Sequence, residues 1–291
     1  PPAGGGEGRV SVRCRVTTIP AGGRITSVTL SVTGADTEAE TELVMQGADA
    51  AGDVAIADPR LWWPHTHGSP VLYEARLRIA TDDGEEVTVR AGRIGFRDLR
   101  LDRDLEPDGL ALAVNGTRLF IRGAVWMPLE SGEAQPAPPD LRAVLEHVVD
   151  AGMNMLRIPG IACYEDDRFH DLCDELGILV WQDFMFANLD YPQLDPDFME
   201  TVAVEVRALL DAHGHRPSLA VLCGGSEVAQ QVAMLGLDPD LANGTLYTEL
   251  LPGLIRDAAI QAAYVPSTPW GGDLPFRPDR GVTNYYGVGA Y

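Results

Sequence analysis

The chain has 291 residues, of which 45% are hydrophobic, and its formal net charge at pH 7 is −21. This length is enough for about two domains, each with a hydrophobic core of its own. The negative charge would repel nucleic acid and anionic membranes, and no apolar run approaches the roughly 18 residues that span a bilayer. We therefore expect neither nucleic acid nor a membrane as a partner, while the composition permits a neutral substrate such as a sugar.

The four cysteines and six histidines form no CxxC pair, no HExxH motif and no other metal-ligand spacing. We therefore expect free thiols, no bound metal and no cofactor. Residues 1–8 are rich in proline and glycine and are interpreted as a linker, so the chain is expected to begin inside a longer protein. They show no signal peptide, which favours a cytoplasmic location.

Residues 9–97 carry the pattern of an antiparallel β-sandwich. Runs such as RVSVRCRV and ITSVTLSV alternate apolar and polar residues and are rich in Val and Thr. Turn signals such as Asp82-Asp83-Gly84 separate these runs. Several short strands at this spacing favour a sandwich of the immunoglobulin type, although the Cys…Trp…Cys pattern of antibody domains is absent.

Residues 98–291 begin with a hairpin signal, Asn115-Gly116 between two apolar runs. After residue 139, short apolar strands alternate with amphipathic helices, which predicts a parallel sheet. About six strands are expected, at FIRGAVW, MNMLRI, ILVWQDF, LAVLC, AYVPST and VTNYY. A doubly wound sheet and a TIM barrel both fit this alternation. Because polar residues follow the strands and no glycine-rich phosphate loop is present, we favour a (β/α)8 TIM barrel that is incomplete here, with its last strands beyond the C-terminus.

The stretch SLAVLCGGSEVAQQ, residues 218–231, places the carboxylate of Glu227 just after an apolar run that is predicted to be a buried strand. Barrel enzymes carry their active sites at the carboxyl ends of the strands. Other residues expected on that face include Arg157, Asp183 and Tyr285. Carboxylates, an arginine and aromatic rings together suit a sugar, although Asp183 could equally cap a helix or form an ion pair with Arg157.

Several motifs are similar, in their order and spacing, to those of one known family. They are LWWPHTHGSPVLYEARL, RIGFRDLRL, VNGTRLFIRGAVWMP, the long stretch from MNMLRIPG to NLDYP, LAVLCGGSEVAQQ, YVPSTPWGG and VTNYYGV. Together they resemble glycoside hydrolase family 2, in its β-mannosidase-like branch. The resemblance covers nearly the whole chain and implies an immunoglobulin-like β-sandwich followed by the N-terminal portion of a TIM barrel.

The resemblance implies retaining hydrolysis of β-linked sugars by double displacement, with Glu227 as the general acid/base. In this mechanism one carboxylic acid protonates the glycosidic oxygen, and a carboxylate roughly 5 Å away attacks the anomeric carbon. The residues expected to bind the carbohydrate substrate are Arg157, Asp183, Ser226 and Tyr285. Nothing in this chain matches the family's nucleophile segment, so the nucleophile is expected beyond the C-terminus and the chain alone is expected to be inactive.

Two positions depart from the family pattern. The family's Asn-Glu pair is Ser226-Glu227 here, and the shorter serine can donate only one hydrogen bond where the Asn bonds the sugar 2-hydroxyl. A tryptophan platform is also missing, because the RVWGGG of the branch is replaced by the sequence 157–160, Arg-Ile-Pro-Gly. These departures keep two alternatives open: a catalytically degenerate carbohydrate-binding or scaffolding protein on the same fold, and a plain interaction module.

Overall fold

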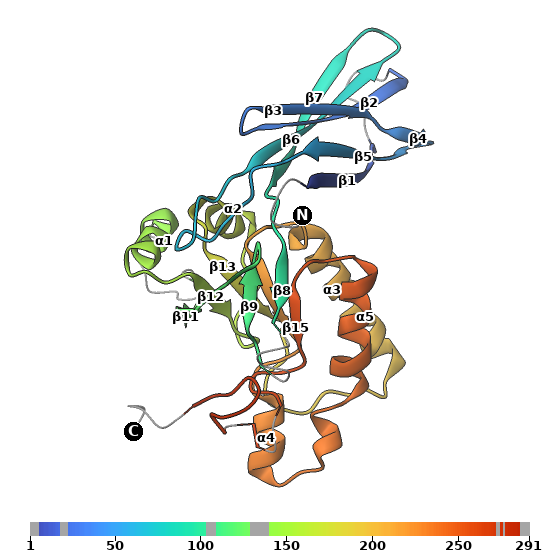
Figure 1. Ribbon diagram of the computed structural model, residues 1–291. Coiled ribbons are helices and arrows are strands. Elements are labelled where there is room, and N and C mark those ends of the chain that lie inside the picture. The colour runs from blue at the N-terminus through green and yellow to red at the C-terminus, as the bar shows by residue number, and fades with distance from the viewer. Residues whose placement is uncertain are drawn as a thin grey trace.

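The fold consists of an antiparallel β-sandwich followed by a parallel β/α region, which confirms the predicted fold class (Figure 1). The computed structural model describes residues 6–17, 23–102, 109–128, 140–271, 274–275 and 277–285. The first strand begins at Glu7, inside the predicted linker 1–8, because Glu7 and Gly8 already pair with the end of a later strand. Residues 1–5 of that linker lie outside the described residues.

Two antiparallel sheets form the sandwich. One has the strand order β1 (Glu7–Arg15), β5 (Asp49–Ala57) and β4 (Val44–Gln46), and the other has β3 (Thr37–Glu42), β2 (Ile25–Gly34), β6 (Tyr73–Thr81) and β7 (Glu86–Ile94). The alternation in β2 makes one of its faces apolar, and Val28, Leu30 and Val32 on that face are fully buried. They belong to one hydrophobic core with Val54 and Ile56 of the opposite sheet.

A small antiparallel sheet connects the two regions. Its strands are, in spatial order, β10 (Thr117–Arg118), β9 (Leu112–Val114) and β8 (Leu99–Leu101). The turn between β9 and β10 confirms the predicted hairpin, since Asn115 and Gly116 both have positive φ, 51° and 78°. Leu112 and Val114 of this sheet share a core cluster with Val221 of the parallel sheet, so the small sheet covers one of its faces.

The parallel sheet has five strands in sequence order within the described residues (Figure 1). They are β11 (Gly123–Val125), β12 (Met155–Ile158), β13 (Leu179–Asp183), β14 (Leu219–Cys223) and β15 (Ala263–Val265). All five residues of β14 are buried, as predicted for a strand covered on both faces. This strand, the fourth of the five, ends four residues before Glu227.

Helices pack against the other face of the parallel sheet. They are α1 (Leu141–Asp150), α2 (Asp167–Leu176), α3 (Pro196–His213) and α5 (Leu251–Asp257), with α4 (Val228–Leu235), a 3-10 turn (Pro239–Leu241) and a π-helical turn (Leu246–Leu250) between β14 and β15. The side chains of Asp140, Asp166 and Asp195 cap the first three helices by accepting backbone N–H bonds. Across the part of the chain that the structure describes, no helix is long and apolar enough to cross a membrane.

The sequence predicted a sixth strand at residues 282–286. This prediction is wrong for residues 282–285, which form no strand in the structure. Val282 instead makes an isolated antiparallel bridge with Trp270, so the chain folds back on the segment that follows β15. A parallel neighbour needs a long crossover, usually a helix. The segment 266–281 contains four prolines, which oppose a helix there. Residue 286 lies outside the described residues.

Two buried side chains fasten the sandwich region to the β/α region. The indole of Trp62 is fully buried and donates to the carbonyl of Asp174 in α2, at 2.8 Å. The guanidinium of Arg97 donates to the carbonyls of Pro217, Leu219 and Gln261. Burial lowers the pKa of Arg97 to about 10. The strand β14 is thereby held from its amino-terminal end.

A histidine pair is buried between α2 and α3. The rings of His170 and His213 stack with centroids 4.0 Å apart, and neither ring nitrogen of His170 has a hydrogen-bond partner. Burial, the neighbouring His213 and the positive charge of Arg216 lower the pKa of His170 well below its usual value. Burial and Arg216 also lower the pKa values of His213 and His215. These histidines are therefore neutral in the folded protein.

This pair predicts that the protein loses stability in mild acid. Below about pH 6.5 the unfolded chain binds more protons on these histidines than the folded protein does, so the free energy of unfolding falls. His170→Phe should weaken this fall by up to about 1.4 kcal/mol per pH unit. Urea denaturation at pH 7.5 and 5.5 measures it, with His147→Gln on the exposed side of α1 as the control. Equal pH dependence in wild type and His170→Phe would contradict the assignment.

Candidate active site

The loops after three adjacent strands stay paired beyond the strand ends. Ser226 forms isolated parallel bridges with Ala187 on one side and Thr268 on the other. Backbone bonds reinforce this pairing: the N–H of Glu227 donates to Thr268 at 2.7 Å, and the N–H of Ser226 donates to Phe186 at 2.8 Å. The carboxyl ends of β13, β14 and β15 therefore form one fixed surface around Ser226 and Glu227.

An ion pair between Arg157 of β12 and Asp183 of β13 is the centre of this surface. The guanidinium donates to both carboxylate oxygens, with Nη2 to Oδ2 at 2.6 Å and Nε to Oδ1 at 3.3 Å. The side chain of Asp183 is 0% exposed and that of Arg157 is 22% exposed. The two residues were expected to share a face, and the ion pair is the alternative that the sequence had left open for Asp183.

Trp181 and Thr268 complete the surroundings of this pair. The indole N–H of Trp181 donates to Oδ1 of Asp183 at 2.8 Å, and the guanidinium carbon of Arg157 lies 5.6 Å from the centre of the Trp181 ring. Arg157 also donates to the hydroxyl of Thr268. The neighbouring Ser267 instead accepts the backbone N–H of Ala229 at 3.4 Å. Because Pro266 follows the last residue of β15, alternation along that strand does not indicate which hydroxyl faces Arg157.

Ser226 lies within the same cluster and is 5% exposed. Its hydroxyl donates to Oδ2 of Asp183 at 2.6 Å. It accepts from Nη2 of Arg157 at 3.2 Å and from the backbone N–H of Gly160 at 2.9 Å. Gly160, which sequence reasoning did not select, lies so close to the neighbouring loop that a Cβ would stand 2.4 Å from the carbonyl oxygen of Phe186.

Glu227 follows in a left-handed backbone conformation, with φ 62° and ψ 12°. This conformation is uncommon for a residue with a side chain and often marks a functional position. The residue occupies the cap position of α4, yet its side chain makes no capping hydrogen bond. It is partly buried, and among the described residues none donates a hydrogen bond to its carboxylate.

Arg157 carries a fixed positive charge at the strand-end surface near Glu227. Burial disfavours the charge of Arg157, but the hydrogen bond and the ion pair with Asp183 outweigh burial, so the pKa of Arg157 is raised. The negative charge of Glu227 contributes to this rise, which requires the two side chains to be near each other. The strand-end surface thus holds one partly buried carboxylate without a hydrogen bond, next to a fixed positive charge.

The side chains of two aromatic residues near the strand ends, Tyr285 and Trp126, are not joined to this cluster, although the backbone N–H of Trp126 donates to the carbonyl of Arg157 at 2.7 Å. Tyr285 is 58% exposed, and no contact within the described residues joins it to the cluster. Its neighbour Asn284 bonds Gln230 of α4 at 3.2 Å. Trp126 is 6% exposed and donates instead to Glu165, at 2.7 Å. Tyr286 lies outside the described residues.

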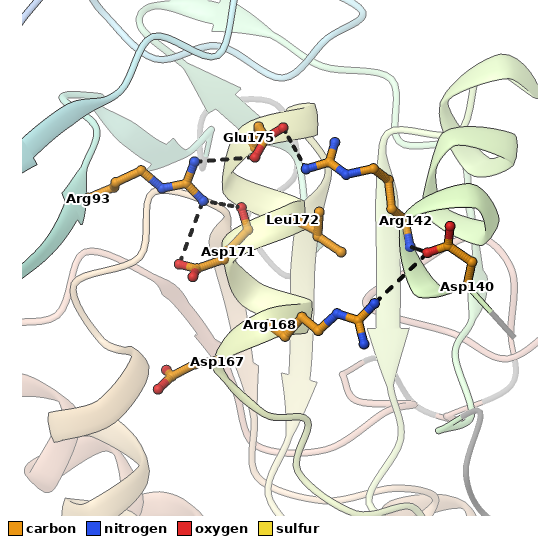
Figure 2. A pocket seen from close by; sticks show the side chains of 8 residues that line it. All are labelled: Arg93, Asp140, Arg142, Asp167, Arg168, Asp171, Leu172 and Glu175. Atoms are coloured by element: carbon orange, nitrogen blue, oxygen red, sulfur yellow. Dashed lines mark hydrogen bonds and ion pairs between the residues drawn. The ribbon is translucent and has the colours of Figure 1, made fainter. Parts of the chain in front are cut away.

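A charged groove lies elsewhere, between β7, α1 and α2 (Figure 2). Its lining is Arg93, Asp140, Arg142, Asp167, Arg168, Asp171, Leu172 and Glu175. Figure 2 shows Glu175 between two arginines, with contacts of 3.3 Å to Arg93 and 2.8 Å to Arg142. The arginines of the groove form ion pairs with carboxylates. These ion pairs connect β7, α1 and α2. No group of three metal-ligating side chains occurs in the described ranges of the chain.

Known proteins with similar sequences show the family to which this chain is related. Residues 4–97 match the sequence profile of the family Glycosyl hydrolases family 2. Beta-mannosidase B of Aspergillus oryzae is 31% identical over 249 residues, which are 80% of this chain and 29% of that protein. The chain is a homologue of family 2 glycoside hydrolases.

Two further proteins are similar to a larger share of this chain, including its parallel sheet. Beta-mannosidase of Rattus norvegicus is 31% identical over 274 residues, covering 88% of this chain and 30% of that protein. The crystal structure of Beta-D-Mannosidase from Dictyoglomus thermophilum superimposes with a TM-score of 0.79 and 26% identity, over 97% of this chain and 35% of the other. The chain spans about a third of the length of these relatives.

Removing the charge of Asp183 should destabilise the protein strongly. Asp183→Asn leaves Arg157 three-quarters buried without its counter-charge, and breaking a buried pair in this way costs about 3 kcal/mol. Urea denaturation measures the loss. Asp49→Asn is the matched control, because it removes the same charge from the exposed Arg15–Asp49 pair and should leave the midpoint almost unchanged. Equal midpoints for the two variants would show that the Asp183 pair does not stabilise the fold.

Proposed function

We propose that the full-length protein is a retaining glycoside hydrolase that acts on β-linked sugars, with Glu227 as its general acid/base. One observation carries this proposal: Glu227 lies in the turn after the buried strand β14, near Arg157, and no described residue donates a hydrogen bond to its carboxylate. A carboxyl group that is free to exchange a proton with a substrate oxygen is what this role needs. The homology to glycosidases implies a carbohydrate as the substrate.

The other carboxylates near the strand ends are less suited to the role. Asp183 is fully buried and already accepts four hydrogen bonds, so it can neither reach a substrate nor exchange a proton readily. Glu165 accepts the indole N–H of Trp126. Among the described carboxylates near the strand ends, Glu227 is therefore the best candidate for the acid/base.

The reaction proceeds in two steps. In the first, Glu227 gives its proton to the glycosidic oxygen while a nucleophilic carboxylate forms a bond to the anomeric carbon and the alcohol departs. In the second, Glu227 takes a proton from water, whose oxygen displaces the enzyme carboxylate and releases the sugar with its β-configuration retained. We place the nucleophile outside this chain, because no further carboxylate is joined to the Arg157 cluster among the described residues.

β-Mannosides are the substrates that we propose first, because relatives from a fungus and a mammal carry the name β-mannosidase. The second candidate is a carbohydrate-binding protein of the same fold that has lost catalysis. The serine at position 226, where the family has asparagine, favours this alternative. A panel of 4-nitrophenyl β-glycosides on the full-length protein separates the two: hydrolysis supports the enzyme, and sugar binding without hydrolysis supports the binding protein.

Glu227→Ala should lose activity in a way that depends on the leaving group. A 4-nitrophenyl or methylumbelliferyl β-glycoside needs the proton more than a 2,4-dinitrophenyl β-glycoside does. The variant should therefore lose about 10²–10⁴-fold in kcat/KM on the first two and clearly less on the third. Added azide should restore turnover as the β-glycosyl azide, because azide attacks the glycosyl-enzyme without base catalysis.

The control is Glu249→Ala, which removes an exposed glutamate in the π-helical turn and should keep wild-type rates on all three substrates. Equal losses of Glu227→Ala on all leaving groups, with no product from azide, would refute the acid/base role. Wild-type rates in Glu227→Ala would refute any catalytic role.

A further inference from the structure

The hydroxyl of Ser226 is almost fully engaged by its protein neighbours. A serine hydroxyl can donate one hydrogen bond and accept two. Here it donates to Asp183 at 2.6 Å and accepts from Gly160 at 2.9 Å and Arg157 at 3.2 Å. The side chain is also 5% exposed. The contact with Arg157 is the weakest, because the two hydrogens of Nη2 are shared with the closer Asp183 and Thr268. Even so, the only proton of the hydroxyl is given to Asp183, and the buried oxygen faces Gly160 and Arg157, which leaves a substrate hydroxyl little access to it.

The carboxylate of Asp183 has no free position at which to accept another hydrogen bond. Its two oxygens accept from Trp181, from Nε and Nη2 of Arg157, and from Ser226. These four bonds fill the four acceptor positions of a carboxylate. Arg157 differs, because its Nη1 donates no hydrogen bond to a described residue and is not fully buried. Of these three residues, only Arg157 retains a polar group for a ligand.

We propose that Ser226 is a positioning residue that holds Glu227 and the Gly160 loop in place and makes no contact with the sugar 2-hydroxyl. The proposal rests on the proposed function of Glu227. This positioning role replaces the expectation that Ser226 binds substrate. Substrates are then selected by groups other than Ser226. The 2-hydroxyl should contribute little to recognition through position 226.

The link from Ser226 to Glu227 runs through the backbone. A left-handed residue with a side chain costs about 1–2 kcal/mol, so its surroundings must impose it. Glu227 is held by its N–H bond to Thr268, and the N–H of Thr268 bonds back to Gly225. Between these two bonds, the Ser226 side chain ties the same turn to Asp183 and to the backbone of Gly160. The turn that aims Glu227 thus depends on the serine hydroxyl.

The first test is a comparison of two substrates on the full-length protein with Ser226→Ala. They are 4-nitrophenyl β-mannoside and its 2-deoxy analogue, which differ only in the 2-hydroxyl. A misplaced acid/base lowers kcat/KM by the same factor on both, up to about 10²-fold. A lost substrate contact lowers it on the mannoside alone. A factor that differs more than tenfold between the two substrates would overturn the proposal.

The second test needs no activity. Amide hydrogen exchange of Ser226→Ala should be faster at Gly160, whose N–H loses its acceptor, and at Glu227, whose turn loosens. The matched control is Ser218→Ala at the other end of β14, which removes a buried hydroxyl beside Asp174, far from Gly160 and Glu227, and should change neither of these two amides nor turnover. Unchanged exchange at Gly160 and Glu227 in Ser226→Ala would overturn the positioning role. If the full-length protein hydrolyses neither substrate, the proposed function fails, and exchange still decides the role of Ser226.

Discussion

The strand-end surface depends on the buried carboxylate of Asp183. A carboxylate without water is stable only if donors surround it, and Asp183 obtains them from Arg157, Trp181 and Ser226. These donors come from two strands and from the loop after β14. The need to satisfy one charge therefore fixes the relative positions of three chain segments. Glu227 follows directly on the last of these donors.

The scaffold around this cluster is held from the opposite side by the sandwich region. Trp62 reaches α2, and Arg97 binds the carbonyls at the start of β14 and before β15. Both side chains are buried, so the contacts are shielded from water and salt. Strand β14 is thus anchored at its amino-terminal end by the sandwich region and at its carboxyl-terminal end by Asp183. A fixed strand of this kind can hold a catalytic group within the narrow geometry that acid/base chemistry needs.

Most of the charged groups described above have an ion-pair or hydrogen-bond partner, whereas the carboxylate of Glu227 accepts no hydrogen bond from a described residue. The groove between α1 and α2 is rich in ionisable groups, but its arginines are paired. The buried histidines of α2 and α3 are neutral, because burial and Arg216 lower their pKa values. Against this background the unbonded carboxylate of Glu227 stands out more than any cavity does.

The sequence by itself determined the order of strands and helices, the hairpin at Asn115 and the place of Glu227 after a buried strand, because these follow from local alternation, turn residues and apolar runs. It misjudged the segment 282–285 and did not indicate Thr268 as a partner of Arg157, since prolines break the alternation there. Only the tertiary structure decided which polar atoms are free. Asp183 and Ser226 are correctly placed as strand-end residues, yet their hydrogen bonds go to groups up to 69 positions away in the chain. Hydrogen-bond saturation arises from packing between distant segments, and no local pattern encodes it.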